Sequence, residues 1–180
     1  RIENETRETR NDLLRPLFAF PTSEGLLAVL GNVEKAALFA EADEIVAGKV
    51  RLFGAAPVEL NLAIPGKLEH WTAYETGKAD FRHLTLDIKM LWEPARFGWV
   101  FSLGRAFHLN LDEKYAESFW HNYETFAAAN PPYLGPNWVS SQEVALRLMA
   151  FVWAMQVFSA SSSSTPGRKA ALARATTFHA

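Results

Sequence analysis

The apolar positions along this chain recur mostly at helical spacing, and the pattern therefore predicts a mainly α-helical protein. Short links between the later helices indicate antiparallel neighbours, so we expect stacked helical hairpins. Helices are predicted over residues 23–47 (with a break at Gly31-Asn32), 94–109, 113–129, 140–158 and from residue 165 onward.

Capping residues and prolines define the expected helix starts. Asp112 and Ser140 precede apolar helical runs as N-caps, and Glu143 stands three residues after Ser140 as its capping-box partner. Pro94 fits the first turn of the helix over 94–109. Thr165-Pro166 combines a cap with a proline at the first helical position, which predicts another helix start.

One stretch has the alternation of a strand rather than a helix. Residues 49–53 alternate between charged and apolar side chains, residues 54–57 are typical of a turn, and residues 58–60 can pair back. This pattern predicts a small β-hairpin near residues 49–60.

Three segments are predicted to lack regular structure. The charged residues 1–15 are typical of a solvated arm, and residues 65–78 are expected to be irregular while packing over the helices. Residues 159–164 are rich in serine, which predicts a polar linker.

Composition limits the class of protein. The 180 residues are 49% hydrophobic and 21% charged, which is enough for one globular core and predicts a single domain over residues 1–180. The net charge of -2 gives no basic excess for binding nucleic acid or an anionic membrane. The absence of cysteine excludes disulfides, thiolate metal sites and a cysteine nucleophile.

Three further features of the sequence concern a membrane span, a signal peptide and signs of truncation. The run near residues 148–158 contains Gln156 and is too short to span a bilayer. No signal peptide is visible. The chain begins at Arg1 and stops at Ala180 inside a helical pattern, so we expect a fragment of a longer protein.

The loop over residues 130–147 reads NPPYLGPNWVSSQEVALR and joins two predicted helices. Its prolines end the first helix, because proline lacks a backbone donor and disfavours helix in the residue before it. The loop then presents Asn137 and Trp138 at the N-terminal end of an apolar helix, where partial positive charge suits a carboxylate. The alternative is that Asn137 is a turn residue and Trp138 fills the core.

Charged residues cluster before and within the helices. Asp87, Lys89, Glu93 and Arg96 can form ion bridges near a helix start, or serve only as a structural network.

Glu143 and Arg147 are four residues apart on one helix face and can pair with each other. Arg147 lies in an apolar helix and needs a partner or a groove.

Other common site types are not indicated. The sequence has no HExxH-type pair, no glycine-rich phosphate loop and no Gly-x-Ser-x-Gly elbow. His108 lies near an apolar stripe, where a hydrogen-bonded packing role is expected. The histidines are scattered along the chain: His70, His83, His108, His121 and His179.

Two ordered motifs carry a resemblance to a known family. The run LDIKMLWEPARFGWVFSLGRAFHLNLDEKYAESFW, followed by the 130–147 loop, resembles the N-terminal helical domain of heparinase II/III polysaccharide lyases, over about residues 45–160. The matching positions are Asp87-Ile88-Lys89, Trp92-Glu93, Arg96, Asp112 to Ala116, Asn130-Pro131, Gly135, Asn137-Trp138, Glu143 and Arg147.

The resemblance implies an incomplete (α/α) toroid of antiparallel helical hairpins, followed in the family by a β-sandwich domain. It also implies eliminative cleavage of a uronic-acid-containing polysaccharide, such as a glycosaminoglycan. An asparagine neutralises the uronate carboxylate, a tyrosine abstracts the C5 proton and histidines assist. The asparagine corresponds to Asn137, and the tyrosine and histidines lie beyond Ala180. We therefore expect this chain alone to be inactive.

The resemblance also implies substrate contacts, a compartment and a ligand class. Trp138 and Trp92 are candidates for stacking on sugar rings, and Lys89, Arg96 and Arg147 for contacts with acidic groups, with Glu93 beside them. A bacterial periplasmic or secreted location is implied. No cofactor or metal site is indicated in this chain, and a metal requirement stays open, because a metal site of the family could lie downstream. The polymer, endo or exo action and oligomeric state stay open.

Two other functions are consistent with the same residues. The helical array can bind an acidic glycan without cleaving it, or it can be a helical scaffold for protein contacts. Absence of downstream tyrosine and histidine partners would favour binding, whereas a scaffold predicts no glycan affinity.

Overall fold

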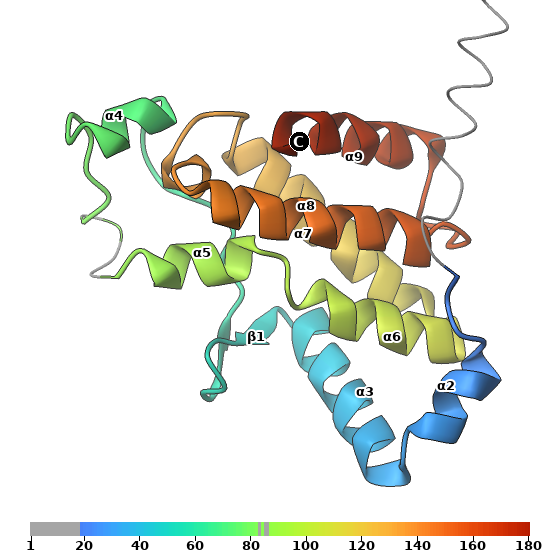
Figure 1. Cartoon of the computed structure of the whole chain (residues 1–180). Coiled ribbons are helices and arrows are strands. Elements are labelled where there is room, and N and C mark those ends of the chain that lie inside the picture. The colour runs from blue at the N-terminus through green and yellow to red at the C-terminus, as the bar shows by residue number, and fades with distance from the viewer. Residues whose placement is uncertain (1–18, 83, 85–86) are drawn as a thin grey trace, which may run out of the picture.

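A computed structural model describes residues 19–82, 84 and 87–180 of the chain (Figure 1). The predicted arm over residues 1–15 and His83 lie outside these residues. The elements in chain order are α2 (Ser23–Val29), α3 (Asn32–Val46), β1 (Lys49–Arg51), β2 (Pro57–Glu59), α4 (Trp71–Glu75), α5 (Lys89–Ala95), α6 (Val100–Asn110), α7 (Glu113–Ala129), the 3-10 helix η1 (Pro136–Trp138), α8 (Ser141–Val157) and α9 (Pro166–His179). The prediction of a mainly helical fold is confirmed, and the incomplete (α/α) toroid stays a prediction.

The longer helices pack side by side around α6 and α8 (Figure 1). Helix α6 contacts α3, α7 and α8, and α8 in turn packs along α9. The link from α6 to α7 is only two residues long, as expected for antiparallel neighbours. The helical layers thereby enclose one hydrophobic core.

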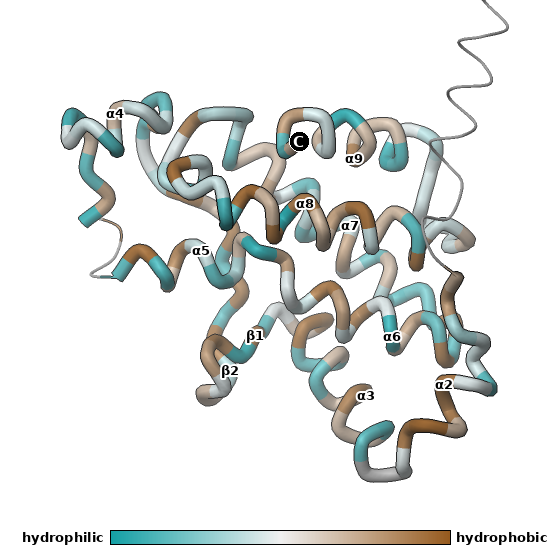
Figure 2. Tube along the Cα trace, viewed as in Figure 1, coloured by the Kyte–Doolittle hydropathy of each residue, from teal (hydrophilic) through white to brown (hydrophobic). Residues whose placement is uncertain are grey.

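Aromatic side chains dominate that core. Phe97, Phe119, Phe151 and Phe158 are almost completely buried. The ring of Phe97 meets Phe151 edge-on with centroids 4.9 Å apart, and Phe119 stacks on Phe158 at 5.2 Å. Along α6 and α7, stretches of hydrophobic residues are interspersed with hydrophilic ones (Figure 2), as expected for helices that bury one face.

Several predicted helix starts are confirmed. Asp112 caps α7 by accepting from the backbone N–H of Lys114, and Thr165 caps α9 in the same way. Ser140 caps α8 by accepting from the N–H of Glu143. The reciprocal half of the predicted capping box does not form, because both carboxylate oxygens of Glu143 bind Arg96.

The single helix predicted over residues 94–109 is wrong. Pro94 lies inside α5, near its end rather than at a helix start, and residues 96–99 separate α5 from α6. Phe97 takes a left-handed φ of 60° in this break, which is costly for a bulky residue. Its ring is fully buried against Trp99, Phe126 and Phe151, and this packing offsets the cost.

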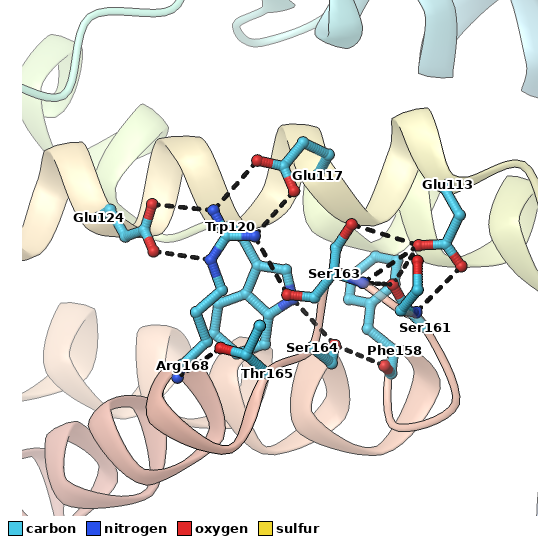
Figure 3. Close-up of polar contacts among 11 residues, drawn as sticks. Glu113, Glu117, Trp120, Glu124, Phe158, Ser161, Ser163, Ser164, Thr165 and Arg168 are labelled. Carbon is cyan, nitrogen blue, oxygen red and sulfur yellow. Dashed lines mark hydrogen bonds and ion pairs between the residues drawn. The ribbon is translucent and has the colours of Figure 1, made fainter.

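The predicted linker over residues 159–164 is instead an ordered turn (Figure 3). The hydroxyls of Ser161 and Ser163 donate to the carboxylate of Glu113, at 2.6 and 3.2 Å. Ser164 accepts from the indole of Trp120 and donates to the carbonyl of Phe158. The serines therefore fold the turn onto α7 by hydrogen bonds that composition alone does not reveal.

An ion-pair network also connects α9 to α7, next to the serine-rich turn (Figure 3). The guanidinium of Arg168 binds both Glu117 and Glu124, each through two hydrogen bonds of 2.7 to 3.1 Å. These contacts fix the start of α9 over the middle of α7.

Of the remaining local predictions, two are confirmed and one is wrong. The β-hairpin is confirmed, with Val50 opposite Val58 in an antiparallel pair. The break at Gly31-Asn32 is also confirmed. The segment 65–78 was expected to be irregular, yet it contains α4, whose His70 cap forms a β-bridge with Leu134.

Gly104 on α6 faces Trp153 and Val157 of α8, and we expect Gly104→Ala to destabilise the protein. A Cβ at this position would lie 2.1 Å from the Trp153 ring and 2.8 Å from Val157. Overpacking of this kind costs about 1–3 kcal/mol. Chemical denaturation measures the loss. Gly98→Ala is the control, because a Cβ there meets nothing within 4 Å; equal stability of the two variants would contradict the prediction.

Candidate functional site

The loop over residues 130–147, called the Asn-Trp loop below, is fixed by hydrogen bonds of two of its asparagine side chains. Asn137 lies in η1 and is only 3% exposed, and its Nδ2 donates to Oδ1 of Asn130 at 2.9 Å. Asn130 in turn donates to the carbonyls of Leu62 and Phe126. Because Asn130 uses its nitrogen for these bonds, its oxygen must accept, and this fixes which way the Asn137 amide points.

This arrangement leaves part of the Asn137 amide unused. Among the described residues its Nδ2 has one acceptor, so a second N–H remains available, and its buried Oδ1 has no partner. The loop before it is shaped by Gly135, whose φ of 90° suits glycine and whose absent side chain leaves room for Leu68. Asn137 is therefore a rigid donor below the surface.

Arg147 is the central cation of the site. Its side chain is buried, and it donates to the carbonyls of Ala95 and Asn137, at 3.1 and 2.9 Å. Its guanidinium also lies 5.4 Å from the Trp138 ring centroid. Burial lowers the pKa of Arg147 to about 10, which still leaves it charged at neutral pH. Arg147 was predicted to need a partner or a groove, and the structure shows partners on other elements.

The pairing of Glu143 with Arg147 predicted from their spacing does not occur. Glu143 instead binds Arg96 of the α5–α6 link, through contacts of 2.5 and 2.8 Å. Glu143 is 3% exposed, and Arg96 also pairs with Glu93. The Glu143 carboxylate raises the pKa of Arg96. Arg147 instead donates to the backbone carbonyls of Ala95 and Asn137.

The α5 residues lie on the outer side of this network. The indole of Trp92 donates to the carbonyl of Pro136 at 3.0 Å, which ties α5 to η1. Asp87 accepts from the backbone N–H of Lys89 rather than forming an ion bridge with that side chain. Lys89 itself is exposed. Trp92, Glu93 and Arg96 are half-buried.

The structure thus brings most of the predicted site residues together. Trp92 donates to η1, and Arg96 donates to Glu143 of α8. Arg147 donates to the carbonyl of Asn137 in η1 and to that of Ala95 at the end of α5. Trp138 is 6% exposed and packs against Tyr133 and His179, so its ring also fills the core. Lys89 is the outermost member of the predicted set.

His179 belongs to this site but was not found by the sequence analysis. Its Nε2 accepts from Nε of Arg147 at 2.8 Å, and its Nδ1 lies 2.8 Å from the carbonyl of Ala175. This pattern makes Nδ1 the protonated nitrogen of a neutral ring. Burial first, and the Arg147 charge second, lower the pKa of His179 to about 4. No spacing rule connects two residues 32 positions apart.

We expect acid to destabilise the protein through His179. In the unfolded chain its pKa is 6.5 and in the folded chain about 4, so the unfolded state binds the proton first as pH falls. The stability contribution is complete above pH 6.5 and declines toward pH 4, by about 3 kcal/mol at most.

Urea unfolding between about pH 7 and about pH 4.5 measures this dependence. His179→Gln supplies the control, because its side-chain oxygen can still accept from Arg147 but does not titrate. The wild type should lose more stability than the variant over this range. Parallel curves would contradict the assignment.

A cavity of about 330 Å³ opens beside the loop, between α7 and α9 and over α8. Its wall is mostly apolar and includes Trp138 and Asn130, with Phe151 from α8. No sequence pattern predicts this cavity. In the part of the chain that is described, no group of three acidic or histidine side chains can hold a metal ion, and no helix is long and apolar enough to cross a membrane.

Comparison with known proteins adds no identification. No family model matches the chain, and no curated protein and no solved structure matches it.

Proposed function

We propose that this chain is the helical toroid part of a polysaccharide lyase that cleaves a uronic-acid-containing polysaccharide by β-elimination. One observation carries the proposal. The motif residues of α5 and those of the Asn-Trp loop are far apart in sequence, yet they form one connected site around Asn137 and Arg147. A shared site explains why both motifs occur in one chain.

The chemistry that we propose requires a donor at the uronate carboxylate. Removing the C5 proton places a second negative charge beside an ionised carboxylate, so donors aimed at that group stabilise the transition state. A preorganised donor of this kind contributes about 3–4 kcal/mol. Asn137 is suited to this role, because its amide donates a hydrogen bond without acting as a base.

The other residues have different tasks in the proposal. Arg147 and Asn130 hold the loop backbone and the Asn137 amide, so they are positioning residues. Arg96 is occupied by two carboxylates and orders the junction of α5 with α8. Lys89 and Trp92 are the members that remain accessible for acidic groups and sugar rings. Asn137 is only 3% exposed, so the proposal requires a rearrangement that uncovers its amide for the substrate.

The proposal extends to the rest of the reaction through the family resemblance. The tyrosine that removes the proton and the assisting histidines are then contributed by sequence following Ala180, together with a β-sandwich domain. The chain alone is expected to bind substrate and not to turn it over. A bacterial periplasmic or secreted location belongs to the same proposal.

A second candidate is a non-catalytic module that binds acidic glycans. The observation that favours it is the burial of the Asn137 amide, which already bonds Asn130. In such a module Asn137 shapes the loop, and the exposed Lys89 makes the charge contact.

A turnover assay separates the two candidates. The protein that carries this chain and its following sequence is incubated with a panel of uronate polymers, and ultraviolet absorbance reports the unsaturated uronate product. The lyase proposal predicts absorbance with at least one polymer. Saturable binding of a polymer without any unsaturated product would reject the lyase and support the binding module.

A further inference from the structure

The cavity between α7 and α9 contains polar groups that the proposed lyase chemistry does not use. Tyr123 of α7 lines it and is only 4% exposed, yet its hydroxyl has no hydrogen-bond partner among the described residues. Burial raises the pKa of Tyr123 to about 12, so the hydroxyl keeps its proton. The hydroxyl is not one of the fully enclosed polar atoms that lack a partner, so it reaches accessible space and is available to donate to a ligand.

A cation lies in the same wall. Arg174 of α9 is exposed, lines the cavity and has no ion pair or side-chain hydrogen bond among the described residues. Its charge acts on the Tyr123 hydroxyl, since it lowers the pKa that burial raises. The nearby Glu124 also lines the cavity, but Arg168 holds both of its oxygens. Arg174 is therefore the cation of this wall that an anionic ligand can reach.

The rest of the cavity is apolar. Rings of Phe126, Trp138, Phe151 and Phe178 and the small side chains of Ala171 and Ala175 make up most of its wall. A volume of about 330 Å³ lies at the lower end of the range for small-molecule sites. A polyhydroxylated sugar would leave its hydroxyls without partners against these rings.

From these contacts we propose that the α7–α9 cavity binds a compact carboxylic acid with an apolar body. The apolar body lies among the aromatic rings, and the carboxylate accepts from the Tyr123 hydroxyl and from the Arg174 guanidinium. Charge-assisted hydrogen bonds of this kind select the acid over its uncharged analogue. The inference stands apart from the lyase proposal, because it concerns a different ligand and does not involve Asn137.

Calorimetric titration of the 180-residue chain with three probes tests the inference. Octanoate has both the charge and the apolar body, octanol lacks the charge, and glucuronate lacks the apolar body. We expect octanoate to bind saturably, and the other two to bind at least about tenfold more weakly. Equal binding of octanol would overturn the carboxylate assignment, and equal binding of glucuronate would overturn the apolar assignment.

Variants locate the binding in the cavity. Arg174→Gln and Tyr123→Phe should each weaken octanoate binding, by about tenfold and about threefold. Ala175→Phe fills the cavity and should abolish binding, with thermal unfolding confirming that the variant folds. Arg82→Gln is the matched control, since the Arg82 side chain is 84% exposed and lies outside the cavity wall.

Other outcomes would reject the inference. Octanoate affinity that is unchanged in Arg174→Gln and Ala175→Phe places the ligand elsewhere. If sedimentation shows a dimer that Ala175→Phe dissociates, a second copy of the chain covers the cavity, and the small-ligand assignment is overturned.

Discussion

Replacing Arg147 with alanine is expected to lower the free energy of unfolding by about 3–5 kcal/mol, because the change leaves several buried groups without partners. The carbonyls of Ala95 and Asn137 and the Nε2 atom of His179 all lose their donor. The truncation also leaves a void beside the rings of Phe126 and Trp138. Urea unfolding measures the effect.

Two controls separate this network from the general effect of removing an arginine. Arg147→Lys keeps the charge, but its single nitrogen cannot replace the three guanidinium nitrogens that reach three separate acceptors, so it should also be strongly destabilising. Arg82→Ala removes a largely exposed side chain and should change stability by less than about 0.5 kcal/mol. A loss for Arg147→Ala no larger than that of Arg82→Ala would contradict the central place of Arg147 in the site.

Replacing Asn137 with alanine is expected to lower kcat/KM for a uronate polymer by about 10²–10³ in the protein that turns it over. The variant loses the amide that we place on the carboxylate in the transition state. Rates are compared at saturating and at limiting polymer concentrations. A transition-state role predicts that most of the loss appears in kcat rather than in KM.

The structural role of Asn137 must be separated from its proposed chemical role. Asn137→Ala leaves the oxygen of Asn130 without its donor, which costs about 1–3 kcal/mol of stability. Asn130→Ala breaks the same bond but keeps the Asn137 amide, so it should retain more activity than Asn137→Ala at equal stability. Equal loss of activity in both variants would assign Asn137 to the structure of the loop alone.

Local chemistry in the sequence predicted the long helices well. The start of α7 at Asp112 and the start of α9 at Thr165 follow from side chains that cap the adjacent backbone. The break at Gly31-Asn32 and the β-hairpin also depend on neighbouring residues. Interactions within a few residues are visible in a sequence, which is why these predictions are confirmed.

Tertiary contacts account for the failures. The break after α5 is stabilised by burial of Phe97 among rings from distant segments, and no local signal marks it. The serine-rich turn is ordered by Glu113, about fifty residues earlier. In both segments the local pattern predicted a simpler structure than the long-range contacts produce.

In the candidate site too, local patterns were predicted and tertiary contacts were not. The sequence identified Asn137, Arg147 and Arg96 as candidate site residues, but the spacing indicated Arg147 as the partner of Glu143, whereas Glu143 binds Arg96. It could not reveal His179 as a partner of Arg147, nor the cavity beside Tyr123. These depend on how α7, α8 and α9 meet, which the spacing of residues along one helix does not define.

The central claim is that the Asn137 amide meets the carboxylate of a uronate sugar. NMR of the isotope-labelled chain, titrated with a short uronate oligosaccharide, tests this contact directly. The side-chain amide signals of Asn137, identified by their loss in Asn137→Ala, should shift in proportion to the bound fraction. Signals that stay unchanged while the chain becomes saturated would contradict the account.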